Sequence, residues 1–237
     1  MSKNKTQPWE EERDKAIDLI NSPTFYGLTL DFYQKEFVAA AMDDEKMLII
    51  SDARAGCGKT VLAAGCAEAL VKSGKYDGII YITAPVQEEN LGFLPGTIQE
   101  KTDIYGEPFV LALEKVGVNP YIAIERDEED IKYSTAYIQL RPHNYLRGLT
   151  FEKKVVIVDE CQNFRFSELK KIITRCCDNC KVFLLGHTMQ CDLRSEQVSG
   201  FYPYLEAAKT EDFAAICPLV TNYRGQLSTW ADSVRKN

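Results

Sequence analysis

The 237-residue sequence lacks an apolar run of the ~18 residues that a membrane-spanning helix needs. Its first residues, MSKNKTQPWEEERDK, also lack the apolar core of a signal peptide. These two absences argue against a membrane partner and predict a cytoplasmic protein. Internal repeats and low-complexity linkers are missing as well. Hydrophobic residues make up 45% and charged residues 27%, a composition typical of a folded globular protein, so we exclude the disordered, collagen-like and coiled-coil classes.

A surplus of positive charge is also missing. The chain has 28 Lys and Arg residues against 35 Asp and Glu residues, and its formal net charge is −7. A global positive field that would attract nucleic acid is therefore excluded. A local basic groove is not excluded, because aromatic and basic residues alternate between Tyr133 and Arg147 and could offer a surface for base stacking and phosphate binding. The favoured interpretation of these residues is that half lie in the core and half on the surface.

The eight cysteines are not accompanied by a secretion signal, so we expect reduced thiols rather than disulfides. Cys177, Cys180, His187 and Cys191 follow one another closely, as the ligands of a zinc site do. However, residues 181–185 (KVFLL) are typical of a buried strand, which would hold Cys180 and His187 roughly 20 Å apart. One zinc ion needs every ligand within ~2.3 Å. The sequence therefore predicts buried or partly buried thiols here.

Strand-like apolar runs alternate with helical stretches through most of the chain. We expect strands over residues 46–51, 78–83, 136–140, 154–159, 181–185 and 214–220. We expect helices over residues 10–20, 31–42, 58–72, 107–116, 167–177 and from 226 onward. Near-continuous Val, Ile and Leu runs separated by helices predict an α/β domain with a mostly parallel sheet and helices on both faces. The expected organisation is an N-terminal extension over residues 1–30 and one domain over residues 31–237.

The segment after the first strand, residues 53–60 (ARAGCGKT), has the form of a Walker A phosphate loop. Backbone N–H groups of such a loop, together with the helix N-terminus, surround phosphate oxygens. Lys59 would contact the β- and γ-phosphates, and Thr60 would ligate Mg²⁺. Ala53 replaces the first glycine of the pattern, and costs about 1 kcal/mol if that position requires a positive φ.

Two carboxylates, Asp159 and Glu160, follow the apolar run of residues 155–158 (VVIV). In nucleotide hydrolases a strand of this kind ends beside the phosphate loop. Asp159 would then hold the Mg²⁺ shell, and Glu160 would orient and deprotonate the attacking water. The alternative is a strand that ends in a solvated acidic turn. The phosphate loop upstream favours the nucleotide interpretation.

Five segments in order resemble motifs of the PhoH family of ATPases. Residues 159–163 (DECQN) resemble the DEAQN box, and residues 53–60 match the loop GPAGTGKT at five of eight positions. Residues 91–96 are identical to the LGFLPG signature. Residues 142–148 resemble the segment P-x-x-Y-M-R-G, and residues 186–193 resemble the GDxTQxDL box, the equivalent of motif III in superfamily 1 helicases.

This resemblance implies a single RecA-like P-loop NTPase domain that uses ATP and Mg²⁺. Gln34 stands where helicase-like ATPases place the glutamine that reads the adenine edge, although an exposed helical glutamine is the alternative. Gln162 and Gln190 resemble γ-phosphate sensors. Arg147 resembles the family arginine before the acidic strand, or serves as a structural ion-pair partner. The residues expected to contact the nucleotide through the loop are Ala55, Gly56, Cys57, Gly58, Lys59, Thr60 and Val61.

The segment Asn222-Tyr223-Arg224 resembles the N-Y-R box of superfamily 1 helicases. Arg224 is therefore a candidate arginine finger, acting within its own chain or on a neighbour, because its guanidinium can neutralise developing phosphoryl charge. An exposed surface arginine is the alternative. The chain also departs from the family pattern, since Ala84 replaces an arginine and His187 replaces the aspartate of the motif III box.

The resemblance implies an ATPase coupled to single-stranded RNA or DNA. Superfamily 1 helicases have two RecA-like lobes, and this chain has room for one. We therefore expect either a homo-oligomer, a hexameric ring by family resemblance, or a weak ATPase on its own. The alternative function is an ATP-dependent regulatory switch without helicase activity that acts through a protein partner. A P-loop kinase of a small metabolite fits poorly, because such kinases seldom combine an Asp-Glu pair with a downstream G-x-x-x-Q box.

Overall fold

The computed structural model describes residues 22, 24–84, 98–125, 136–146, 148–191, 193 and 199–234. The strands are β1 (Leu48–Asp52), β2 (Ile79–Thr83), β3 (Ile138–Pro142), β4 (Val155–Asp159), β5 (Lys181–Gly186) and β6 (Ala214–Ile216). They form one six-stranded sheet in the order β3-β2-β4-β5-β1-β6. Every neighbouring pair in this sheet is parallel. The parallel sheet predicted from the sequence is confirmed.

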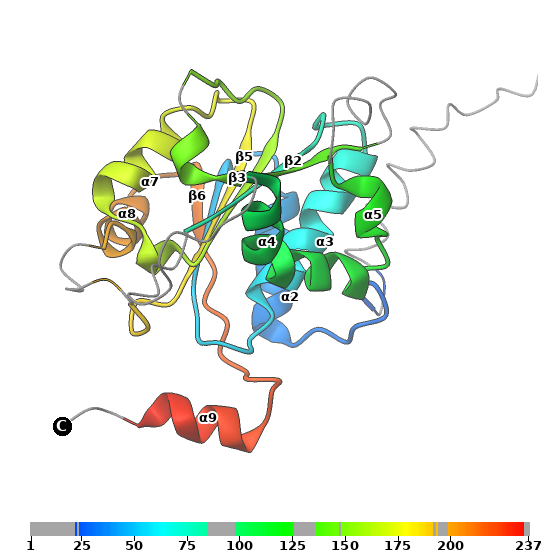
Figure 1. Cartoon of the computed structure of the whole chain (residues 1–237). Helices are drawn as coiled ribbons and strands as arrows, with labels where there is room; N and C mark the ends of the chain where they lie inside the picture. Colours follow the sequence, from blue (N-terminus) through cyan, green and yellow to red (C-terminus); the bar gives the residue numbers. More distant parts are fainter. Residues whose placement is uncertain are drawn as a thin grey trace, which may run out of the picture.

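Helices cover both faces of the sheet. They are α2 (Phe32–Met42), α3 (Lys59–Lys72), α4 (Ile98–Lys115), α5 (Pro120–Ala123), α7 (Phe166–Ile173), α8 (Phe201–Ala208) and α9 (Gln226–Ser233), with short 3-10 helices η1 (His143–Tyr145) and η2 (Cys161–Asn163). Figure 1 shows α2 to α5 on one side of the sheet and α7 and α8 on the other. Helix α9 lies outside both layers (Figure 1). None of the described helices combines the length and apolarity of a membrane-crossing segment.

The central strands are buried on both faces, which explains their uninterrupted apolar sequences. In β4, Val155 and Ile157 pack into the core under α2 to α5, whereas Val156 and Val158 pack into the core under α7 and α8. All four side chains are fully buried. The strand thus supports two cores at once and places its last residue, Asp159, at a fixed point between the two helical layers.

Proline accounts for most differences between the predicted and the observed elements. Helices α5 and α8 were not predicted, because Pro120 and Pro203 in their first turns discourage a helical assignment although proline is tolerated there. Helix α4 begins at Ile98 rather than at 107 and contains Pro108. Strand β6 is shorter than predicted, since it ends at Ile216 and Pro218 lacks the N–H that a strand needs. Helix α7 ends at Ile173 rather than at 177.

Part of the predicted N-terminal extension packs against the domain. Phe25 lies in the core under α2 to α5 with 1% of its surface exposed. The hydroxyl of Tyr26 donates a 3.2 Å hydrogen bond to the carbonyl of Gly65 in α3. The helix expected over residues 10–20 lies outside the described residues. The domain boundary after residue 30 stays a prediction.

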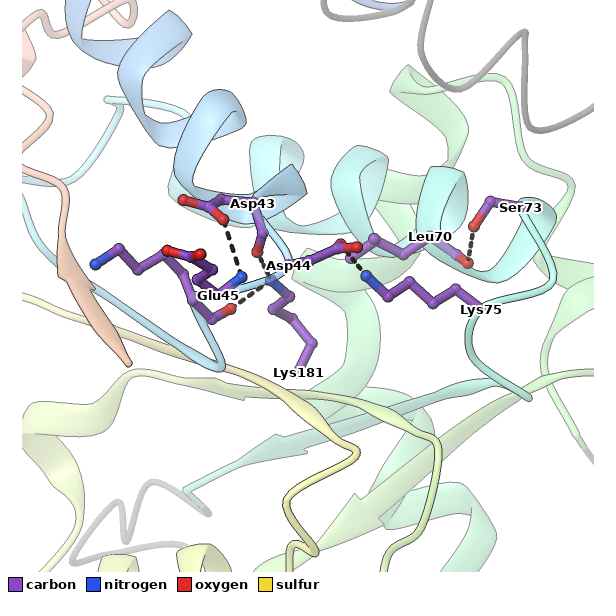
Figure 2. A network of polar contacts seen from close by, with 8 residues as sticks. Asp43, Asp44, Glu45, Leu70, Ser73, Lys75 and Lys181 are labelled. Atoms are coloured by element: carbon purple, nitrogen blue, oxygen red, sulfur yellow. Dashed lines mark hydrogen bonds and ion pairs between the residues drawn. The ribbon is translucent and has the colours of Figure 1, made fainter. Parts of the chain in front are cut away.

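A buried lysine lies at the edge of the sheet where β5 begins (Figure 2). Lys181, the first residue of β5, is 1% exposed, and its Nζ donates to the carbonyls of Asp43 and Lys46 beyond the end of α2. Lys75 pairs with Asp44 beside it. Burial, assisted by the charge of Lys75, lowers the pKa of Lys181 to about 8 although the Asp43 carboxylate acts in the other direction. This ammonium group therefore ties the α2–β1 connection to β5.

Candidate nucleotide-binding site

Three neighbouring strands, β4, β5 and β1, end side by side at the carboxyl edge of the sheet. This edge is where open α/β sheets bind ligands. Asp159 ends β4, His187 follows β5, and the loop of residues 53–58 follows β1. The backbone N–H of Ala53 donates to the carbonyl of Gly186 at 3.0 Å, so the pairing of β1 with β5 continues into the first residue of the loop.

The loop has the backbone geometry that a phosphate cradle requires. Gly56 and Gly58 adopt positive φ values of 83° and 86°, and α3 begins directly afterwards at Lys59. Lys59 Nζ donates to the carbonyls of Ala53 at 2.6 Å and Arg54 at 3.2 Å, and thus folds back across the loop. Ala53 does not adopt a positive φ, so the cost expected for alanine at this position does not arise. The remaining loop residues assigned from the resemblance are partly or fully buried: Ala55, Cys57, Thr60 and Val61.

Two oxygen ligands suited to Mg²⁺ meet at the junction of the loop and β4. The Thr60 hydroxyl donates a 2.8 Å hydrogen bond to Asp159 Oδ2. The same oxygen accepts a 3.0 Å hydrogen bond from the hydroxyl of Tyr81, and the backbone N–H of Glu160 donates to Asp159 Oδ1 at 2.9 Å. Asp159 is 3% exposed, so its orientation is fixed by these donors. A hydroxyl and a carboxylate are hard oxygen ligands, and the pair fits a divalent cation.

Tyr81 is a member of this site that the sequence analysis missed. It lies in β2, two residues before Thr83, which pairs with Asp159 in the sheet. Burial, followed by the charge of Asp159, raises the pKa of Tyr81 well above its usual value, so its hydroxyl stays a donor. No local pattern marks this tyrosine, because its role depends on the pairing of β2 with β4.

Glu160 lies at the exposed rim next to the buried Asp159. It adopts a left-handed conformation with φ 53° and ψ 43°, which is uncommon for a residue other than glycine and typical of functional sites. Its Oε2 accepts a 2.6 Å hydrogen bond from Gln162 Nε2. Gln162 is 2% exposed, and its Oε1 accepts a 2.9 Å hydrogen bond from the backbone N–H of His187. One amide therefore connects the end of β4 to the end of β5.

The turn after β5 is fixed to β1 by a pair of hydrogen bonds. The backbone N–H and the hydroxyl of Thr188 donate to the two carboxylate oxygens of Asp52, each at 2.9 Å. The sequence analysis assigned neither residue, although an aspartate directly after a buried strand is the same signal that identified Asp159. Gln190 lies in this turn with an exposed side chain, and its backbone N–H donates to the carbonyl of His187 at 3.0 Å.

Gln34, the residue that the resemblance assigns to base recognition, lies beside the loop. Its Nε2 donates to the carbonyl of Cys57 at 3.3 Å. Its Oε1 and backbone N–H form the capping box of α2 with Asp31. Burial acts to raise the pKa of Asp31, but hydrogen bonds from the backbone of Gln34 and from other groups outweigh it and lower this pKa below its usual value. Asp31 is therefore ionised at neutral pH.

The Asn222-Tyr223-Arg224 segment packs against the loop of its own chain. The backbone N–H of Tyr223 donates a 2.9 Å hydrogen bond to the carbonyl of Gly56. A Cβ atom placed on Gly56 would lie 2.4 Å from Asn222 Oδ1 and 3.0 Å from Arg224 Cγ. Arg224 itself is exposed, and its backbone N–H donates to Asn222 Oδ1 at 2.8 Å. The segment thus carries Arg224 to the rim of the loop.

Some residues assigned from the sequence are not placed by the structure. Arg147 and the LGFLPG segment, residues 91–96, lie outside the described residues. The strand predicted between Cys180 and His187 is confirmed as β5, which separates the two residues by its whole length. Within the described part of the chain, no group of three His, Cys, Asp or Glu residues could hold a metal ion.

Comparisons with known proteins agree with this architecture. A family model described as PhoH-like protein matches residues 29–230. The protein PhoH of Escherichia coli (strain K12) is 37% identical over 177 residues, which cover 73% of this chain and 48% of that protein. The PhoH-like protein of Bacillus subtilis (strain 168) is 34% identical over 181 residues, which cover 76% and 54%. The chain spans about half the length of the curated relatives that it matches.

Solved structures of a bacteriophage terminase and a bacteriophage helicase share the fold at low sequence identity. The large terminase of bacteriophage HK97 superposes with a TM-score of 0.54 at 14% identity, over 93% of this chain and 47% of the terminase chain. The UvsW helicase of bacteriophage T4 superposes with a TM-score of 0.51 at 16% identity, over 87% and 67%. At these identities the likeness concerns the fold, which is that of a RecA-like ATPase domain.

Proposed function

The chain belongs to the PhoH-like protein family, and from this premise we propose that it binds ATP with Mg²⁺ and hydrolyses it. The observation that carries the proposal is the hydrogen bond between Thr60 and Asp159, two residues from distant parts of the sequence that meet beside the phosphate loop. Both are the ligand types that Mg²⁺ takes in P-loop ATPases. When bound there, the ion would neutralise phosphate charge and orient the terminal phosphate.

The side chains around this point supply the remaining parts of a hydrolytic site. Lys59 would exchange the carbonyls of Ala53 and Arg54 for the β- and γ-phosphates. Glu160, exposed beside the buried Asp159, is placed to orient a water molecule and accept its proton. Gln162 would sense the presence of the γ-phosphate. Its amide contacts both Glu160 and His187, so a change at the phosphate would shift the ends of β4 and β5 together. Gln190 would join it as the second sensor.

Arg224 is proposed as the arginine that neutralises charge on the leaving phosphates. Its own chain carries it to the rim of the loop through the Tyr223–Gly56 hydrogen bond, and this contact supports action within one chain. Arginine suits the role because its planar guanidinium forms two parallel hydrogen bonds with phosphoryl oxygens. Arg147 stays a predicted nucleotide contact, since it lies outside the described residues.

We further propose that ATP hydrolysis is coupled to single-stranded RNA or DNA in a homo-oligomer, a hexameric ring by family resemblance. The fold shared with a helicase and a terminase supports the coupling. Helix α9 supports an assembly, because Leu227 and Trp230 are 78% and 64% exposed and belong to neither helical layer. The same apolar residues would suit a protein partner, as the alternative function, an ATP-dependent switch, requires. A cytoplasmic location stays a prediction.

The decisive experiment measures ATP turnover by the purified chain with and without single-stranded RNA and DNA. Lys59→Ala should abolish turnover and weaken nucleotide binding, since it removes the cation that contacts the phosphates. Lys170→Ala, an exposed lysine on α7, is the matched control and should behave as the wild type. Normal turnover by Lys59→Ala would overturn the ATPase assignment. Turnover that neither nucleic acid stimulates would favour the switch.

A further inference from the structure

The carboxamide of Gln34 has most of its hydrogen-bonding capacity occupied by the protein. Its Oε1 accepts from the backbone N–H of Asp31 at 3.2 Å and faces the hydroxyl of Tyr223 at 3.3 Å. Its Nε2 donates to the carbonyl of Cys57 at 3.3 Å. An amide oxygen accepts two hydrogen bonds and an amide nitrogen donates two. Among the described residues, these contacts leave Gln34 with one unused N–H and no unused acceptor.

Tyr223 occupies the open side of Oε1 whichever way its hydroxyl points. The hydroxyl has one proton, and both Gln34 Oε1 and Asp31 Oδ2, at 2.9 Å, compete for it. When the proton is on the side of Gln34, the second lone pair of Oε1 is used. When it is on the side of Asp31, the tyrosine oxygen still fills the place that another donor would need. The backbone bond from Tyr223 to Gly56 holds the residue there.

This arrangement has a consequence for base recognition. The N7 edge of adenine presents an acceptor and the N6 amino donor, whereas the same edge of guanine presents two acceptors, N7 and O6. A glutamine selects adenine by donating to N7 and accepting from N6 at the same time. Gln34 keeps the donor but not the acceptor, so it can pair with either purine and reject neither.

We propose that Tyr223 sets the base specificity of the nucleotide site, and that by occupying Gln34 Oε1 it makes the site accept adenine and guanine nucleoside triphosphates alike. The inference rests on the proposed function and extends its substrate class from ATP to purine nucleoside triphosphates. Tyr223 acts here through Gln34 and is a specificity-determining residue rather than a catalytic one. Its side chain is 55% exposed, so removal of the hydroxyl should leave the fold intact.

The test compares the binding of the β,γ-imido analogues of ATP and GTP, with Mg²⁺, to three proteins by calorimetry. The wild type should bind the two analogues with dissociation constants within about threefold of each other. Tyr223→Phe keeps the ring and removes the hydroxyl, which opens Oε1 to the N6 amino group. Its preference for the ATP analogue should rise by about three- to tenfold, the effect of one net hydrogen bond. Tyr202→Phe, an exposed tyrosine on α8, should match the wild type.

Two results would overturn the inference while the proposed function stands. One is a wild type that prefers the ATP analogue by more than tenfold, and the other is a preference that Tyr223→Phe leaves unchanged. If the wild type binds neither analogue, the proposed function fails and the inference fails with it. Thermal unfolding of each variant is measured in parallel, so that a change in affinity is compared between proteins that are equally folded.

Discussion

The backbone N–H of Tyr223 donates a 2.9 Å hydrogen bond to the carbonyl of Gly56, which joins the segment before α9 to the phosphate loop. A Cβ atom at position 56 would lie 2.4 Å from Asn222 Oδ1, so any residue other than glycine there requires the Asn222 side chain to shift. The loop of residues 53–58, Gln34 and Arg224 therefore form one connected structure. A substitution in any one of them should change the conformation of the other two.

Gly56→Ala should uncouple this structure. The new methyl group contacts Asn222, and the alanine has to adopt the φ of +83° that Gly56 has in the fold. We expect a loss of about 1 to 2 kcal/mol in the free energy of unfolding. Gly74→Ala is the control, because Gly74 has a φ of +75° and nothing within 4 Å of the added atom. Urea unfolding should show the cost of the positive φ in both variants and a larger loss of stability in Gly56→Ala, and ATP turnover should fall in Gly56→Ala alone.

The contact with Asn222 can be separated from direct damage to the loop by a double-mutant cycle. In an Asn222→Ala background the oxygen that meets the methyl group is gone, so Gly56→Ala should cost less stability there than in the wild type. Equal costs in the two backgrounds would show that the segment does not press on the loop.

Arg224 should act on the nucleotide of its own chain. Arg224→Ala is expected to lower kcat by ~10²-fold or more with a small effect on nucleotide affinity, because the guanidinium stabilises charge that develops during the reaction. Arg224→Lys should be intermediate, since it keeps the charge without the two-pronged geometry. Mixtures of Lys59→Ala chains with Arg224→Ala chains should stay inactive, as each chain lacks one part of its own site. Recovery of activity in the mixture would instead place Arg224 on a neighbouring chain.

Local patterns were sufficient to predict the loop, the acidic strand end and the parallel sheet. Residues 155–159 (VVIVD) and 58–60 (GKT) each carry their signal within a few positions. The meeting of Thr60 with Asp159 follows as well, because parallel strands bring their carboxyl ends to one edge. These inferences need only the chemical type of the residues and the pattern of apolar and polar positions along the sequence.

Contacts that depend on the order of the strands could not be predicted in this way. Asp52 binds Thr188 because β1 lies beside β5, and Tyr81 binds Asp159 because β2 lies beside β4. The sequence contains no period or motif that specifies this order. Tyr223 is a similar case: its motif indicated an arginine finger next to it, whereas its hydroxyl contacts with Asp31 and Gln34 depend on where the chain returns after β6.

Substitutions of the two adjacent carboxylates should affect nucleotide binding and ATP hydrolysis separately. Glu160→Gln should keep its affinity for ATP with Mg²⁺ while turnover falls by ~10²-fold or more, because the amide cannot take the proton of the attacking water. Asp159→Asn should instead make ATP binding insensitive to Mg²⁺, measured by titration with and without the ion. Glu211→Gln, an exposed carboxylate after α8, is the control. Equal losses of affinity in Glu160→Gln and Asp159→Asn would contradict the assignment of the two roles.

The buried Lys181 should make stability depend on pH in a direction opposite to that of the buried thiols and phenols. Its pKa is about 8 in the folded chain and 10.5 in the unfolded chain. Between these values the unfolded chain holds a proton that the folded chain has released, so this residue makes the free energy of unfolding rise with pH. Burial raises the pKa of Cys217 to about 11. A buried thiol of this kind makes the free energy of unfolding fall as the pH rises over much of the same range. The contribution of Lys181 therefore has to be isolated by a difference between two proteins.

Lys181→Met keeps an unbranched side chain that is one heavy atom shorter, and removes the amine. It should be less stable than the wild type at every pH, because the carbonyls of Asp43 and Lys46 lose their donor (Figure 2). The stability advantage of the wild type over this variant should grow by about 1 to 2 kcal/mol between pH 7 and pH 10, a part of the full shift because pH 10 lies below the pKa of 10.5 in the unfolded chain. Urea unfolding at intervals of one pH unit measures it, with the exposed Lys170→Met as control. An advantage that stays constant or shrinks over this range would mean that Lys181 keeps its proton in the folded chain, and that its two carbonyl partners compensate fully for burial.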